Sequence, residues 1–255
     1  HFQFPIEFID KIHLKTKFKL KRVDKVFCNS LFTKKYIDRK LGVNSSVLYP
    51  PVSIKSTKEL KKENIILHVG RFGVSVEGIN YKKQDVMINV FRKMVGNNLN
   101  GWQFILVIGS RIEDEKKLQQ LKKLAEGYPI KIINNPSSTV LWEQYTRAKI
   151  YWHASGFGED LEKYPEKAEH FGISTVEAMS KGVVPVVINA GGQTEIVENG
   201  KNGFLWDTIE ELSEKTLKLI NNDVLWEKMS KASIERSKKF TGSRFCKELK
   251  EIIDK

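Results

Sequence analysis

The stretch Ile65-Ile66-Leu67-His68-Val69, stopped by Gly70, decides the fold class of this chain of 255 residues. Four of its five residues are apolar, which predicts a strand that is buried on both faces of a sheet. The following segment, 84–94, repeats apolar residues at helical spacing and is predicted to be an amphipathic helix. A buried strand followed by such a helix is typical of a βαβ unit, in which the two strands are parallel.

The same alternation continues for more than a hundred residues. Further strands are predicted at 102–108, 130–133, 150–153 and 186–188, and further helices at 113–126, 139–148 and 172–181. Strands separated by helices at this rhythm predict an α/β fold: a doubly wound parallel sheet, Rossmann-like, with helices on both faces. Residues 208–255 carry mainly helical patterns, and the last helix is predicted to begin at a Ser243 cap.

The first 51 residues have a different character. A strand is predicted over 23–29, a helix capped by Ser30 over 31–41, and a further extended piece from Val47. This stretch is too short to build a core of its own. We therefore expect residues 1–51 to be the tail and hinge of a preceding domain whose beginning lies outside this sequence. Residues 52–241 would form the Rossmann-like domain, and 242–255 a helix that returns toward the first part.

The composition is that of an ordinary globular protein, with 40% hydrophobic and 29% charged residues, and it excludes a collagen-like or wholly disordered chain. The distant pair Cys28 and Cys246 suits a reducing cytoplasm better than a disulfide scaffold. The net charge of 43 − 31 = +12 attracts phosphates, although a lysine-coated solvated surface would give the same excess. The basic stretch Lys11 to Arg22 could in addition contact anionic membrane at its cytoplasmic face.

Several common motifs are incomplete. The run Gly70-Arg71-Phe72-Gly73 does not have the G-x-G-x-x-G spacing of a dinucleotide site. Gly73 and Gly78 have the P-loop spacing, but Ile79-Asn80 follow where Lys-Ser or Lys-Thr is required. There is no zinc-type spacing of cysteine and histidine and no D-x-D pair, so we expect neither a cofactor nor a metal.

The segment from Glu169 to Met179 carries the chemistry. Small residues open a helix directly after a strand and loop, so the amides of Gly172, Ile173 and Ser174 should form an anion site at the edge of the sheet. Glu169 and Glu177 stand on either side of it. An alternative is that Ser174-x-x-Glu177 is only a capping box and that Glu169 is a solvated loop acid.

Glu169 and Glu177 form an E-x7-E pattern that resembles family 4 retaining glycosyltransferases with the GT-B fold. The likeness continues in order along nearly the whole chain, upstream through the V-G-R run that ends at Arg71. The matching runs are Phe171 to Ser174, Glu177 to Val187 (E-A-M-A-x-G-x-P-V-V in the family), Gly191 to Val197 (G-G-x-x-E-I-V), Asn202 to Leu205 (N-G-F-L), Asp24 to Ser30 and Val47 to Val52.

The resemblance implies a role for each matching residue. Arg71 and a following lysine would contact the donor diphosphate; Lys83 is the better match, and Lys82 is the rival. Glu169 would hold hydroxyls of the donor sugar, as a positioning group rather than a nucleophile, and Glu177 the ribose. The residues that complete the donor site are Gly70, Phe171, Gly172, Ile173 and Ser174.

Two further residues end predicted strands at the edge where ligands bind in such sheets. His153 could touch the donor, although a lone histidine at a strand end is more often structural. Asn134 could border the nucleobase, although Asn134-Asn135-Pro136 could equally be an ordinary turn. The charged loop 156–168 has no assignment from sequence.

The expected function is transfer of a hexose from a nucleoside-diphosphate sugar, of UDP or GDP type, to a glycan or lipid-linked acceptor with retention and without a metal. We expect the 255 residues to bind nucleotide but to transfer sugar poorly or not at all. The alternative is a basic nucleic-acid-binding module, suggested by lysines interleaved with Phe18 and Leu20. It lacks any RRM, KH or helix-turn-helix signature, so no nucleic-acid partner is expected.

Overall fold

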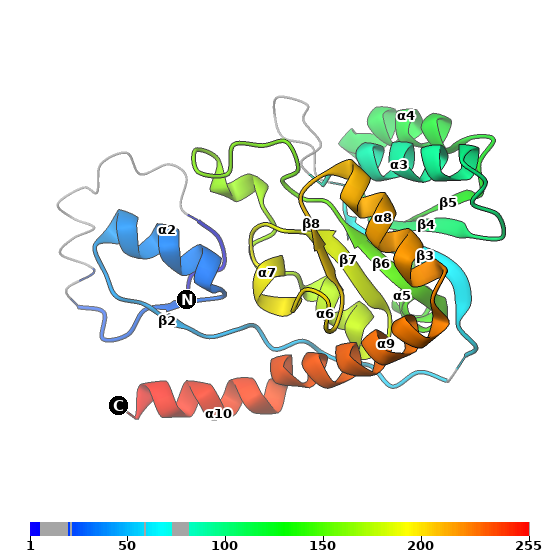
Figure 1. Cartoon of the computed structure of the whole chain (residues 1–255). Coiled ribbons are helices and arrows are strands. Elements are labelled where there is room, and N and C mark those ends of the chain that lie inside the picture. Colours follow the sequence, from blue (N-terminus) through cyan, green and yellow to red (C-terminus); the bar gives the residue numbers. More distant parts are fainter. Residues whose placement is uncertain (6–19, 21, 59, 73–81, 255) are drawn as a thin grey trace.

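The computed structural model describes residues 1–5, 20, 22–58, 60–72 and 82–254. Within them, six parallel strands form one sheet in the spatial order β5-β4-β3-β6-β7-β8 (Figure 1). The strands are β3 (Glu63–Arg71), β4 (Gln103–Gly109), β5 (Ile130–Asn134), β6 (Ala148–His153), β7 (Val184–Ile188) and β8 (Phe204–Trp206). The predicted doubly wound fold is confirmed. Its strand order reverses between β3 and β6, the point at which such sheets bind ligands.

Helices cover both faces of the sheet. Alternate side chains of β3 explain this: Ile66 packs into one core, and Ile65 and Leu67 pack into the other. The first core includes α3 (Gln84–Gly96), α4 (Glu115–Ala125) and α8 (Ile209–Ile220), and the second includes α5 (Ser138–Arg147) and α6 (Ile173–Ser180). The remaining helical elements of the sheet domain are η1 (Ile112–Asp114), η2 (Pro165–Lys167), α7 (Gln193–Ile196), α9 (Asp223–Ser237) and η3 (Lys238–Phe240).

One strand of the sheet and the cap of the last helix differ from the sequence prediction. Strand β8 was not predicted, because three residues are too few to show a period. The final helix, α10 (Gly242–Ile253), begins after Thr241, so the predicted Ser243 cap is wrong. Ser243 lies inside the first turn, where its hydroxyl is 3.1 Å from that of Thr241.

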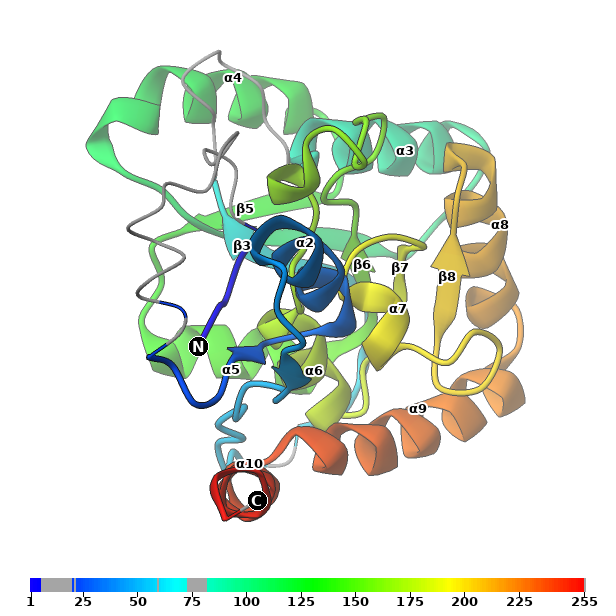
Figure 2. The same cartoon turned by 90° about the vertical axis from the view of Figure 1, so that its left-hand side faces the viewer.

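The N-terminal residues form a small unit beside the sheet. Strands β1 (Phe27–Cys28) and β2 (Ser46–Val47) are parallel and flank α2 (Leu31–Leu41), so the strand predicted over 23–29 is real but much shorter. The predicted cap is confirmed, because the Ser30 hydroxyl accepts the Thr33 amide at 3.0 Å. The α10 helix runs alongside this unit, and both termini lie on the same side of the molecule (Figures 1 and 2). The basic stretch Lys11 to Arg22 lies almost entirely outside the described residues.

Hydrogen bonds attach helix α2 to the loops at the carboxyl edge of the sheet. The amides of Leu31 and Phe32, in its first turn, donate to the Glu195 carboxylate at 2.7 and 2.9 Å. Further along α2, the Tyr36 hydroxyl donates to the Leu161 carbonyl at 2.9 Å. The small unit is therefore held next to the loops that follow β6 and β7, where the candidate site lies.

Candidate active site

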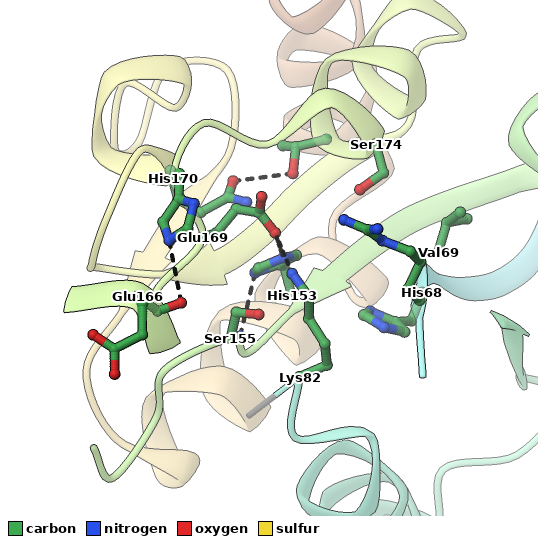
Figure 3. A network of polar contacts seen from close by, with 12 residues as sticks. His68, Val69, Lys82, His153, Ser155, Glu166, Glu169, His170 and Ser174 are labelled. Carbon is green, nitrogen blue, oxygen red and sulfur yellow. Dashed lines mark hydrogen bonds and ion pairs between the residues drawn. The ribbon is translucent and has the colours of Figure 1, made fainter. Parts of the chain in front are cut away.

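A buried polar cluster centred on Glu169 lies at the carboxyl end of β6 (Figure 3). One carboxylate oxygen, Oε2, is 2.8 Å from the Lys82 ammonium and 3.0 Å from His153 Nε2. The exposed fractions of the side chains are 20% for Glu169, 18% for Lys82 and 2% for His153. The structure therefore brings His153 and Lys82 into direct contact with the carboxylate that the sequence singled out.

The cluster keeps Glu169 ionised. Burial by itself would raise the pKa of Glu169, but the charge of Lys82 and the hydrogen bond from His153 hold that pKa well below its usual range. Burial lowers the pKa of His153, so its imidazole is neutral at pH 7. The Ser155 amide donates to His153 Nδ1 at 3.4 Å, which leaves the proton on Nε2 to face Glu169. Glu169 is thus a fixed, negatively charged hydrogen-bond acceptor.

Helix α6 begins at the edge of this cluster. Its N-cap is Gly172, with a φ of 118° and no side-chain cap, so the amides of the first turn have no capping partner among the described residues. The alternative of a Ser174–Glu177 capping box is excluded, because Ser174 lies inside the helix and Glu177 bonds elsewhere. The amides and the helix dipole together can hold an anion.

The glycine pair that follows β7 shapes the same loop. The Gly192 amide donates to the Glu169 carbonyl at 2.7 Å. A Cβ at Gly191 would lie 2.3 Å from that carbonyl oxygen, and one at Gly192 would lie 2.5 Å from the Phe171 Cα. Only glycines allow the two segments to approach this closely, so the pair holds the backbone of Glu169 in place.

Glu177, the second carboxylate of the pattern, is held by a tyrosine from the neighbouring helix. The Tyr145 hydroxyl, on α5, donates to Glu177 Oε2 at 2.9 Å. Burial raises the pKa of Glu177, and the Tyr145 hydrogen bond opposes that rise. No sequence signal pointed to Tyr145, because a tyrosine on the inner face of a helix is normally a core residue.

Tyr151 connects the elements between the two carboxylates. Its hydroxyl donates to the Val69 carbonyl at 3.1 Å and lies 2.8 Å from Ser174 Oγ, so β3, β6 and α6 are joined at one point. Burial raises the pKa of Tyr151, and the charges of both Glu169 and Glu177 raise it further. Both carboxylates therefore act on one hydroxyl group of the site. Sequence reasoning missed Tyr151 as well.

Arg71 and Gly70 end β3 at the same edge of the sheet. Alternation along the strand places Arg71 on the same face as Leu67, which packs with α6 in the second core. Arg71 is exposed, and its Cγ is directed toward Gly109 of β4. At Gly70 an added Cβ would lie 3.1 Å from the buried ring of His68. The exposed side chain of Arg71 thus lies at the carboxyl end of β3.

The two candidate lysines point to different acids. Lys82 contacts Glu169, whereas the Lys83 ammonium is 2.6 Å from Glu159, a residue of the loop that the sequence left unassigned. Lys167 completes this second group, 2.9 Å from the other oxygen of Glu159. The structure therefore brings Lys82, and not Lys83, to the Glu169 cluster.

Three remaining predicted residues have distinct environments. Phe171 is buried and packs against Tyr49 and Phe240, so its side chain belongs to the core and only its backbone borders the site. Ile173, the first residue of α6, is 49% exposed. The side chain of Asn134 accepts a hydrogen bond from the Ser110 hydroxyl at 2.9 Å, which ties the ends of β4 and β5 together.

No group of three or more metal-binding side chains occurs among the residues described. In the same part of the chain, every helix is too short or too polar to cross a membrane.

Comparison with known proteins matches residues 51–240 to the family model described as "Glycosyl transferases group 1". The chain belongs to the group 1 glycosyl transferases. It is 28% identical over 220 residues to a probable sucrose-phosphate synthase of Thermosipho melanesiensis, covering 84% of this chain and 46% of that protein. It is 26% identical over 231 residues to GDP-Man:Man(3)GlcNAc(2)-PP-Dol alpha-1,2-mannosyltransferase of Dictyostelium discoideum, covering 84% and 43%. The chain thus spans less than half the length of these two curated relatives.

Two solved structures share the fold of this chain. The Anabaena protein Alr3699/HepE, in complex with UDP and glucose, superposes with a TM-score of 0.75 at 17% identity over 99% of this chain and 70% of that one. TarM superposes with a TM-score of 0.72 at 18% identity over 99% of this chain and 49% of that one. At these identities the likeness establishes the GT-B glycosyltransferase fold, as the sequence motifs predicted.

Proposed function

We propose that this chain is the donor-binding half of a glycosyltransferase that moves a hexose from a nucleoside diphosphate to a glycan or lipid-linked acceptor. The observation that carries the proposal is the convergence of Lys82, Glu169 and the uncapped start of α6 at the switch point of the sheet. Family membership supports the same reaction class.

The diphosphate would lie against the first turn of α6. Amides of Ile173 and Ser174, the helix dipole and the Lys82 ammonium all place positive charge there. Arg71, at the end of β3, supplies a second cation at the edge. Negative charge grows on the diphosphate as the sugar leaves, so fixed donors of this kind stabilise the transition state more than the bound donor.

The two carboxylates would hold the sugars on either side of the diphosphate. Glu169 stays ionised and already has two donors, which suits a positioning residue that accepts hydrogen bonds from hexose hydroxyls. Glu177, held by Tyr145, would accept from the ribose hydroxyls. In this scheme the departing phosphate oxygen takes the proton of the attacking hydroxyl on the same face of the sugar, and the anomeric configuration is retained.

The relatives guide the choice of donor. Alr3699/HepE was solved with UDP and glucose, and the Dictyostelium relative is named for GDP-mannose and a dolichol-linked acceptor. These names support a UDP or GDP donor, and they include a lipid-linked acceptor among the candidates. The match to a glycosyl transferase family gives no support to the alternative of a nucleic-acid-binding module.

A thermal-shift screen tests the proposal. We expect a UDP or GDP sugar to raise the melting temperature of the wild-type chain, since saturation at about 100 Kd adds about 2.7 kcal/mol to the stability of the native state. NAD serves as the control ligand, because it carries a diphosphate between two riboses but no hexose. If no nucleotide sugar raises the melting temperature, or if NAD raises it as much, the proposed function is wrong.

A further inference from the structure

Two adjacent lysines are held by the two ends of one loop. Lys82 binds Glu169 at 2.8 Å, and Lys83 binds Glu159 at 2.6 Å. Both acids belong to the connection between β6 and α6, ten positions apart at 159 and 169. This connection therefore controls the direction of both lysine side chains at the start of α3.

The backbone at Lys83 needs such control. Lys83 is the N-cap of α3 and has a φ of 55° and a ψ of 35°, the left-handed conformation, with no side-chain cap bond. That conformation costs a residue with a Cβ roughly 1–2 kcal/mol. It persists only where surrounding contacts determine it. The ion pair with Glu159 is such a contact, because it fixes the far end of the same side chain.

The Glu159 group is well shielded from water. The side chains of Glu159, Lys83 and Lys167 are 11%, 15% and 16% exposed. Burial would raise the pKa of Glu159, but the hydrogen bonds from both lysines lower it below its usual value. Removing one member of a shielded pair leaves an unpaired charge, so this group resists rearrangement far more than a surface pair does.

We propose that Glu159 is a positioning residue for diphosphate recognition, which acts by holding Lys83 and thereby the turn that directs Lys82 toward the site. The inference rests on the proposed function and adds a residue to it. The left-handed turn sends the side chain of Lys83 to Glu159 and leaves Lys82 beside Glu169 (Figure 3 shows the Lys82 pair).

Electrostatic attraction and the positioning role predict opposite effects of removing Glu159 on diphosphate binding, which makes the proposal testable. Glu159 is an anion near an anion-binding site, so its removal should tighten diphosphate binding if only electrostatics matter. The same result follows if Lys83 is itself the diphosphate ligand, because loss of Glu159 would free it. If Glu159 acts by positioning, its removal weakens binding although the site becomes more positive.

The experiment is calorimetric titration of UDP and GDP, and of UMP and GMP, into wild type, Glu159→Gln and Glu162→Gln. Glu162→Gln is the matched control, because Glu162 lies in the same loop, its substitution removes the same charge, and its ion pairs with Lys35 and Arg39 lie at the surface. We expect Glu159→Gln to weaken binding of the preferred diphosphate about fivefold or more, with the monophosphate changed less than twofold. Glu162→Gln should match wild type for both ligands.

Lys83→Met provides an independent arm if Glu159→Gln folds poorly. Because it removes the same contact, Lys83→Met should weaken diphosphate binding by a similar factor. The double variant, Glu159→Gln with Lys83→Met, should bind diphosphate no more weakly than either single variant. The proposal is overturned if Glu159→Gln binds diphosphate as tightly as wild type or tighter. Equal loss of monophosphate and diphosphate also overturns it, since that would mean a general disturbance of the loop. Failure of the wild type to bind any of the four nucleotides would reject the proposed function itself, and this inference with it.

Discussion

Tyr145 of α5 and Glu177 of α6 are joined by a hydrogen bond of 2.9 Å, in which the buried phenol donates to the carboxylate. This contact fixes the carboxylate assigned to the ribose, and it opposes the rise in the pKa of Glu177 that burial causes.

Tyr145→Phe should therefore weaken nucleotide binding. A hydrogen bond to a charged group is worth about 1.5–3 kcal/mol, which is the upper limit of the binding free energy that can be lost. We expect the affinity for nucleotide to fall about threefold to tenfold at pH 8. The defect should grow at pH 6, because the pKa of Glu177 rises further without its donor and more of the carboxyl is protonated. Calorimetry at the two pH values measures this. Tyr128→Phe, which lies outside the site three residues after the end of α4, should bind nucleotide as the wild type does.

The stability of the chain should depend on Glu169 in a defined pH window. The native pKa of Glu169 is well below its usual value, so its ion pair contributes stability above the unfolded pKa, about 4.3. That contribution is lost as the pH falls through the lower native pKa. Urea denaturation of wild type and Glu169→Gln should give different unfolding free energies at pH 7 that converge toward acid pH. A difference independent of pH would show that Glu169 is not held ionised.

Gly192→Ala should destabilise the loop that carries Glu169. Gly192 has an ordinary φ of −68°, so only crowding against the backbone of His170 and Phe171 opposes a methyl group. We expect a loss of about 1–3 kcal/mol in thermal unfolding, together with weaker nucleotide binding. Gly96→Ala is the control: its Cβ meets nothing within 4 Å, and alanine should stabilise α3 by up to about 1 kcal/mol.

Glu195 should protect the first turn of α2. Its carboxylate accepts the amides of Leu31 and Phe32, bonds to a charged group that are each worth about 1.5–3 kcal/mol. In Glu195→Ala, native-state hydrogen exchange at these two amides should accelerate about tenfold or more. Glu210→Ala, in α8, should leave both amides unchanged. Unchanged exchange in Glu195→Ala would mean that α2 is held by other contacts.

Much of the fold followed from the sequence, and the reasons are local. A buried strand such as 65–69 and an amphipathic helix such as 84–94 each carry their period within a few residues, so five of the six strands and the helices between them were predictable. Strand β8, with three residues, has no period to detect. The predicted Ser243 cap is wrong because the N-cap of α10 is Thr241, two residues earlier, and a run of short residues such as 241–243 does not specify which of them precedes the helix.

The site was only partly accessible to sequence reasoning. The positions of Glu169, Glu177 and Gly172 followed from the start of a helix after a strand. The contacts of Glu177 and of Lys83 did not, because Tyr145 reaches Glu177 from another helix and Glu159 reaches Lys83 from the loop 156–168. The direction of Lys82 depends on the left-handed φ of Lys83, which no spacing rule foretells at a non-glycine residue.

The most direct test of the account is calorimetric titration of UDP and GDP into wild type, Lys82→Met and Lys93→Met. Lys93 lies in the last turn of the same helix, α3. The Lys93→Met substitution therefore removes the same charge at a position away from the Glu169 cluster. The account predicts that one nucleotide binds the wild type, that Lys82→Met weakens this binding at least about tenfold, and that Lys93→Met changes it less than twofold. Equal affinities for all three proteins would contradict the placement of the diphosphate at Lys82 and the start of α6.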